Sequence, residues 1–171
     1  MYQKSDHCGL RPTRDTYRLD IELMFREPST SLSMAYFQRL SDITGYVKAT
    51  QIDPIEMKAF LSHVMLLDMP DTSNPVSSLK FRLVGTEATH VLGELTGEHL
   101  HDVWPDNGFG GFVQAIEKVI ETREPVRLVS EGRHGAWSLL RSEGLVAPLF
   151  DDNDRICRFL VVIEIGDASL R

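Results

Sequence analysis

The chain has 171 residues, with 25 acidic and 18 basic side chains, and its formal net charge is −7. This length suits one domain with an extension, or at most two small domains. The negative charge argues against general nucleic-acid binding, because such proteins use a positive surface to displace the counterions of the phosphate backbone.

The sequence also argues against a membrane protein or a secreted one. No apolar run approaches the roughly 20 residues that a helix needs to cross a bilayer. Residues 1–18 lack the apolar core of a secretory signal. The two cysteines, Cys8 and Cys157, form neither a disulfide framework nor a paired metal motif. We therefore expect a cytoplasmic location without membrane contact.

Residues 1–30 are expected to form an N-terminal arm, and residues 31–62 a helical lead-in. Apolar and polar residues alternate from Tyr17 to Leu23, which indicates a short strand or a docking arm. A helix is predicted to begin near Pro28 and to end at Gly45. One face of this helix is apolar and is expected either to contact a second copy or another protein, or to pack on the chain's own sheet. Its residues are Leu32, Tyr36, Leu40 and Ile43.

A second helix is predicted from Asp53 to about Leu61, because Asp53 can cap it and Pro54 suits its first position. The remaining pattern predicts five strands with helices between the second and the third. The expected strands are 64–69, 79–84, 126–130, 136–149 and 156–165, and the expected helices are 86–92, closed by Gly93, and 109–123. The fourth strand is expected to be interrupted by the polar residues 141–144. The fifth is apolar on both faces and is expected to lie centrally. This order predicts an α+β fold, an antiparallel sheet with helices on one face.

The order and spacing of several short motifs resemble those of a PAS domain. They are Asp53-Pro54 with Glu56, the apolar strand 63–68, Phe81-Arg82-Leu83-Val84-Gly85-Thr86, Leu95-Thr96-Gly97, and Pro148-Leu149 before an acidic turn and the last apolar strand. More narrowly, the chain looks like the PAS-variant family of short stand-alone proteobacterial proteins. The resemblance covers about residues 34–165.

The resemblance implies a five-stranded antiparallel sheet with short helices over one face, formed by residues 63–166 and preceded by the helical extension. It further implies a pocket between that sheet and those helices. PAS domains commonly bind a small molecule in this pocket, or they only pair with other domains. In such proteins the flanking N-terminal helices often make the dimer contact.

Five side chains are candidates for binding a ligand: Arg82, Trp104, Phe112, Trp137 and His63. If Arg82 faces the helices, its guanidinium needs a carboxylate or an anionic ligand, and otherwise it lies in solvent or at an interface. The three aromatic residues are either pocket walls or core fillers. His63 is either part of the site or a structural histidine with a satisfied ring.

Motifs for metal binding and catalysis are weak. His99 and His101, with His90 nearby, suggest a metal or haem site only weakly. The run 151–154 lacks the glycine and distal glutamate of a calcium loop. No nucleophile elbow, zinc-protease or kinase motif is present. We therefore expect no metal site and no catalytic residue, and no motif identifies a cofactor.

These patterns favour a cytoplasmic bacterial sensory or regulatory module without enzymatic activity, which binds a small ligand or a protein partner in signal transduction. No output domain is recognised, so the signal is expected to pass through a homodimer or a signalling partner protein. One alternative is a small enzyme acting on an apolar acid or ketone, which requires Arg82, His63 or Asp102 to converge in one cavity. Another is a purely structural dimerisation module with a filled core.

Overall fold

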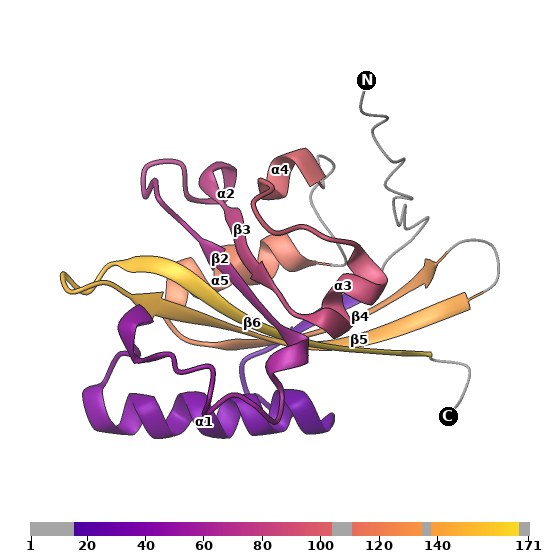
Figure 1. The fold of residues 1–171 in the computed structure, drawn as a ribbon, viewed down its shortest axis with the longest axis horizontal. Helices are drawn as coiled ribbons and strands as arrows, with labels where there is room; N and C mark the ends of the chain where they lie inside the picture. The colour runs from indigo at the N-terminus through magenta and orange to yellow at the C-terminus, as the bar shows by residue number, and fades with distance from the viewer. Residues whose placement is uncertain (1–15, 104–110, 135–137, 168–171) are drawn as a thin grey trace.

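The computed structural model describes residues 16–103, 111–134 and 138–167 and gives an α+β fold around one sheet (Figure 1). The strands are β1 (Thr16–Asp20), β2 (Val64–Asp68), β3 (Lys80–Val84), β4 (Val126–His134), β5 (Ser138–Phe150) and β6 (Ile156–Asp167). The helices are α1 (Pro28–Thr44), α2 (Pro75–Ser78), α3 (Thr86–Leu92), α4 (Leu100–Val103) and α5 (Phe112–Thr122), with short 3₁₀ turns η1 (Ala49–Gln51) and η2 (Leu61–His63). The predicted fold class is confirmed.

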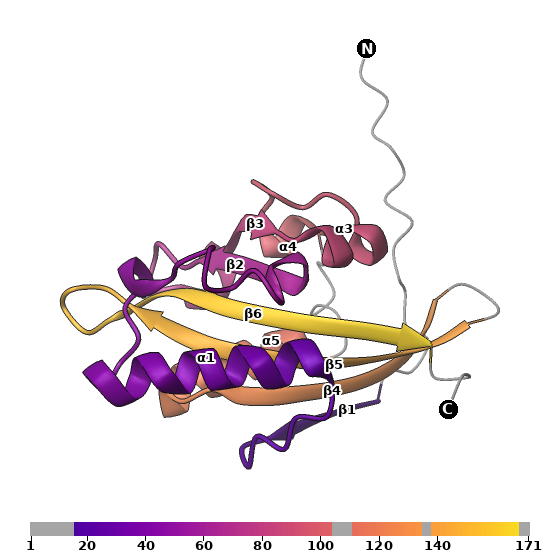
Figure 2. The same ribbon diagram turned by 60° about the horizontal axis from the view of Figure 1, so that its bottom comes forward.

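The sheet has six antiparallel strands in the order β1-β4-β5-β6-β2-β3, one more than expected. The additional strand is β1, which pairs with β4 over its whole length and forms one edge of the sheet (Figure 2). The alternating pattern of the N-terminal arm is therefore that of a strand. The apolar β6 lies between β5 and β2, as predicted.

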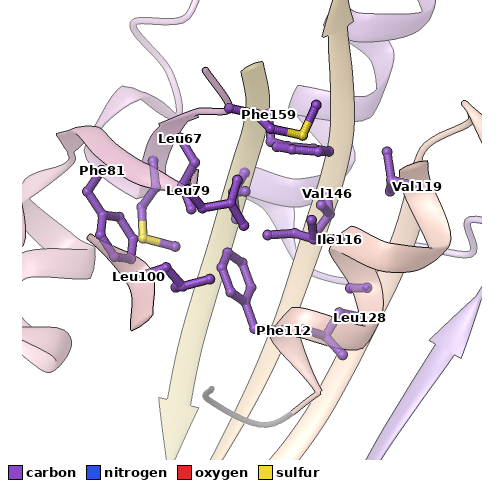
Figure 3. Close-up of a cluster of buried hydrophobic side chains, with 14 of the residues drawn as sticks. Leu67, Leu79, Phe81, Leu100, Phe112, Ile116, Val119, Leu128, Val146 and Phe159 are labelled. Atoms are coloured by element: carbon purple, nitrogen blue, oxygen red, sulfur yellow. The ribbon is translucent and has the colours of Figure 1, made fainter. Parts of the chain in front are cut away.

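One face of the sheet, here called the helical face, carries the larger core. Side chains from β2, β3, β4, β5 and β6 meet α3, α4 and α5 there. Figure 3 shows Phe112 and Ile116 of α5 pointing towards Leu79, Leu100 and other side chains of this cluster. The described part of this face is lined by buried apolar side chains.

The opposite face, here called the outer face, is covered by α1 and the segment 47–61. Tyr36, Phe37 and Leu40 of α1 pack with Met57, Phe60 and side chains of β2, β5 and β6. Figure 1 shows α1 on the side of the sheet away from α3 and α4. The short helices α3, α4 and α5 thus cover one face, as expected, and α1 packs on the other face, which is one of the alternatives left open for it. The reason is visible in β6, whose Leu160 and Val162 are apolar on the second face and need their own cover.

Two local predictions were wrong. Residues 54–60 form successive turns and not a helix, although the Asp53 carboxylate does accept the N–H of Ile55 at 2.8 Å. After one bond of helical spacing, Met57 N–H to Asp53, the chain changes to three-residue spacing with Phe60 N–H to Met57. Met57 and Phe60 are both buried against the sheet.

The second wrong prediction concerns β5, which continues through residues 141–144 without interruption. Each polar side chain that suggested a break has a partner. Ser142 Oγ lies 2.6 Å from Ser130 Oγ, and Glu143 forms an ion pair with Arg127. Because both partners come from the neighbouring β4, the strand tolerates its polar residues.

Candidate functional site

A groove of about 610 Å³ lies on the outer face, between the segment 49–62 and the strands β2 and β3. Most of its lining is apolar, and the charged side chains in it are Arg82 and Arg158. The lining residues are Ala49, Ile52, Pro54, Met57, Leu61, Ser62, Val64, Leu66, Arg82, Leu83, Val84, Gly85, Thr86 and Arg158. A volume of this size, apolar with few polar groups, is typical of small-molecule sites. We call it the outer groove.

A bulge in β3 shapes the floor of the groove. Leu66 pairs with Leu83 and Leu67 pairs with Phe81, so Arg82 is an extra residue without a partner on β2. A bulge of this kind turns two successive side chains towards one face. Phe81 is buried in the helical-face core, whereas Arg82 and Leu83 both line the outer groove.

The wall of the groove is fixed to α1 and to β3. The Asp53 N–H donates to the Tyr36 hydroxyl at 3.0 Å, and Arg39 forms an ion pair with Glu56 at 2.7 Å. At the other end Gly85 lies against η2, where a Cβ atom at position 85 would stand only 2.3 Å from the Ser62 carbonyl oxygen. The segment 49–62 therefore stands in a set position over β2 and β3.

The charged end of the outer groove has more cations than anions. Asp68 binds Arg158 through one oxygen (2.5 Å to Nε) and Arg82 through the other (3.4 Å). Among the described residues neither guanidinium has an ion pair with another carboxylate. The Arg82 side chain is 55% exposed and that of Arg158 is 21% exposed, so Arg82 has the greater freedom to turn towards a ligand.

The three predicted ligand-binding residues that the structure describes do not come together. Arg82 lines the outer groove and faces away from the helices. Phe112 is buried in the helical-face core. The ring nitrogen Nδ1 of His63 lies 3.1 Å from the Ile163 carbonyl oxygen, the position of a structural histidine. Trp104 and Trp137 lie outside the described residues. A site at Arg82 therefore remains a prediction, and it lies on the other face of the sheet from the pocket that the resemblance implied.

The predicted interface stripe on α1 divides in two. Tyr36 and Leu40 are buried, at 7% and 6% exposure, in the core between α1 and the sheet. Tyr36 and Leu40 therefore pack on the chain's own sheet, which is the second of the two alternatives given for this stripe. Leu32 and Ile43 are 49% and 71% exposed and remain candidates for contact with a partner.

Sequence reasoning missed a buried charge cluster on the outer face. Arg127 contacts Glu143 through Nε and Nη2, and Asp20 through Nη1 at 3.2 Å. Glu143 also accepts the hydroxyl of Thr30 and the backbone N–H groups of Arg26 and Glu27. Burial alone would raise the pKa of Glu143, but these hydrogen bonds outweigh it and hold the pKa below the usual range of a glutamate. Arg127 lies between the apolar residues Val126 and Leu128, and this alternation indicates that its side chain points to the outer face, opposite to theirs.

The residues of the enzyme alternative are scattered. Arg82 lies at the groove and His63 at the end of η2, while Asp102 in α4 is exposed and pairs with His101 at 2.9 Å. Among the described residues, no three His, Cys, Asp or Glu side chains gather in a way that could hold a metal ion. Within the same residues, no helix has the length and apolar character needed to cross a membrane.

Comparison with known proteins identifies one matching family, described as PAS domain, whose model matches residues 25–164. Similar solved structures are the light-state LOV domain of the blue-light photoreceptor Aureochrome1 and a light-oxygen-voltage domain studied with a flavin analogue. The Aureochrome1 domain is 12% identical, with a TM-score of 0.46, and the match covers 66% of this chain and 88% of that one. The domain studied with a flavin analogue is 16% identical, with a TM-score of 0.46, and the match covers 66% of this chain and 85% of that one.

An RNA-binding light-oxygen-voltage receptor is 11% identical, with a TM-score of 0.48, and the match covers 90% of this chain and 39% of that one. No curated protein matches the chain.

Proposed function

Because the chain belongs to the PAS domain family, we propose that it is a sensory or regulatory module that binds a small, partly apolar ligand in signal transduction. The observation that carries this proposal is the outer groove, with about 610 Å³ of mainly apolar space. Ligand sites in proteins usually combine such an apolar wall with a few polar groups that orient the bound molecule. Arg82 and Arg158 would supply that orientation.

The proposal includes the way in which the signal leaves the module. Pairing with a second copy or with a signalling protein would use the exposed part of α1, where Leu32 and Ile43 lie. We place the protein in the cytoplasm of a bacterium and within the stand-alone PAS-variant group. The sequence 81–86, followed by Leu95-Thr96-Gly97, supports this narrower assignment.

Native mass spectrometry of the freshly purified protein, compared with the same sample after denaturation, tests the proposal. We expect a mass excess that disappears on denaturation, together with the mass of a dimer. The excess identifies a ligand by mass, and the spectrum gives the number of copies. A bare monomer that gains no mass after incubation with a small-molecule extract of bacterial cells would contradict the proposal.

A further inference from the structure

The outer groove is amphiphilic, and its two ends differ in kind. Leu66, Leu83 and Met57 offer alkyl surface along the groove, while Arg82 and Arg158 stand together beside Asp68. A neutral apolar ligand would leave the charged end unused. A ligand with one polar head and one apolar tail would match both.

The sign of the charge at that end determines the sign of the head group. Arg82 and Arg158 share Asp68, which leaves an excess of one positive charge on three side chains. Lys80 lies opposite Asp68 across the β2–β3 ladder and is exposed on the same side of the sheet, which adds a further positive charge. An anionic head group is therefore favoured, and a cationic one is disfavoured.

From these observations we propose that the outer groove binds an anionic amphiphile, a molecule with a carboxylate head at Arg82 and an alkyl tail along the apolar floor. This inference rests on the proposed function, since it names the class of ligand and its site. The guanidinium of Arg82 is suited to the head group, because arginine can hold a carboxylate with two parallel hydrogen bonds. The Nε–H of Arg158 donates to Asp68, so Arg158 would hold the Asp68 carboxylate in position beside Arg82.

Titration calorimetry of the full chain with decanoate, below its micelle-forming concentration, tests the proposal. We expect saturable binding of one decanoate per chain, and affinity that rises about threefold to fourfold for each methylene from hexanoate to decanoate. Decanol and decyltrimethylammonium, which keep the tail but change the head, should bind at least tenfold more weakly.

Two arginines with partly accessible side chains, Arg82 and Arg141, provide the matched variants. Arg82→Gln should weaken decanoate binding about tenfold, because it removes a hydrogen bond to a charged group. Arg141→Gln makes the same change of charge on β5, where Arg141 lies near Glu131 and outside the groove, and should leave the affinity unchanged. Leu83→Gln, at a residue that is already 38% exposed, should reduce the dependence on tail length. Circular dichroism establishes that each variant is folded.

Each outcome bears on the proposal. Equal loss of affinity in the Arg82 and Arg141 variants would mean attraction by net charge alone and would overturn the site. Equal binding of decanol would overturn the head-group assignment. If all the amphiphiles fail to bind while native mass spectrometry still finds a ligand, this inference fails and the sensory function stands. If decanoate drives two copies together without saturating at one per chain, the groove is an interface between copies.

Discussion

At the scale of single residues, Glu143 is a buried carboxylate on the outer face with several hydrogen-bond partners. Its carboxylate joins three parts of the chain, namely the start of α1, strand β4 through Arg127, and its own strand β5. Such a cluster is stabilising only while all its partners are present, because a buried charge without a partner is costly. Glu164 lies opposite Glu143 on β6 and accepts the N–H of Ser29, so the two carboxylates hold the first turn of α1 together.

Glu143→Gln should therefore lower the free energy of unfolding at neutral pH by about 3 kcal/mol, since it leaves Arg127 buried without its main charge partner. Glu164→Gln, on the neighbouring strand and only partly buried, should cost about 1 kcal/mol because it weakens one hydrogen bond. Urea unfolding of both variants measures the difference. Equal losses would show that the Arg127 pair contributes nothing beyond ordinary capping of α1.

The same carboxylate predicts how stability depends on pH. Because the pKa of Glu143 is lowered in the folded protein, its contribution is complete above the unfolded-state pKa and is lost as the pH falls through the folded-state pKa. The pKa of Asp20 is also lowered, since hydrogen bonds from the Glu22 N–H and from Arg127 outweigh the opposing effect of burial. The difference in free energy of unfolding between wild type and Glu143→Gln should thus become smaller once the pH falls below the usual pKa range of a glutamate. A constant difference across an acid titration would contradict this assignment.

The buried cluster also shows where sequence reasoning failed at this scale. Arg141-Ser142-Glu143-Gly144 looks polar, and a polar run within a strand is easily interpreted as a break. Its partners, Arg127 and Ser130, are 12 to 16 residues away in sequence. Only the register of β4 against β5 brings them together, and register depends on long-range pairing that one strand's sequence does not contain.

At the scale of elements, α1 has a buried side and an exposed rim. Leu32 and Ile43 are eleven residues apart, about three helical turns, so they lie along the same line of the helix. If this rim is the contact between copies, the variant with both Leu32→Asp and Ile43→Asp should remain folded and change from dimer to monomer. Size-exclusion chromatography with light scattering measures this change.

Leu40→Ala is the matched control on the buried side of α1. It should lower the free energy of unfolding by about 3 kcal/mol, because it leaves a cavity between the helix and the sheet. Its effect on the dimer should be secondary to this loss of stability. A dimer that survives the two rim substitutions would exclude the exposed part of α1 as the contact.

Elements whose signals are local were predicted well. The helix α3 runs from Thr86 to Leu92 and ends at Gly93, whose φ of +85° suits glycine. Gly45 likewise ends α1 with φ of +81°. The segment 53–61 was predicted less well, because it forms turns packed against the sheet although Asp53 makes the capping bond expected of a helix start. The bulge at Arg82 left no recognisable signal, and the outer groove depends on it.

At the scale of the whole molecule, strand β1 packs against the start of helix α5. Tyr17 of β1 lies against Gly111, the residue that precedes α5. A Cβ atom at position 111 would stand 2.3 Å from Cγ of the Tyr17 ring, a distance that requires one of the two residues to move. The edge strand and the helix are therefore packed together only because position 111 is a glycine.

Gly111 combines this close packing with a left-handed backbone, at φ of 81° and ψ of 10°. Gly111→Ala should lower the free energy of unfolding by about 3 kcal/mol, of which about 1 kcal/mol is the strain of a left-handed residue and about 2 kcal/mol comes from the overlap with Tyr17. In a Tyr17→Ala background only the backbone strain should remain, as a double-mutant cycle in urea would measure. If Gly111→Ala costs the same in both backgrounds, then β1 does not rest on the start of α5.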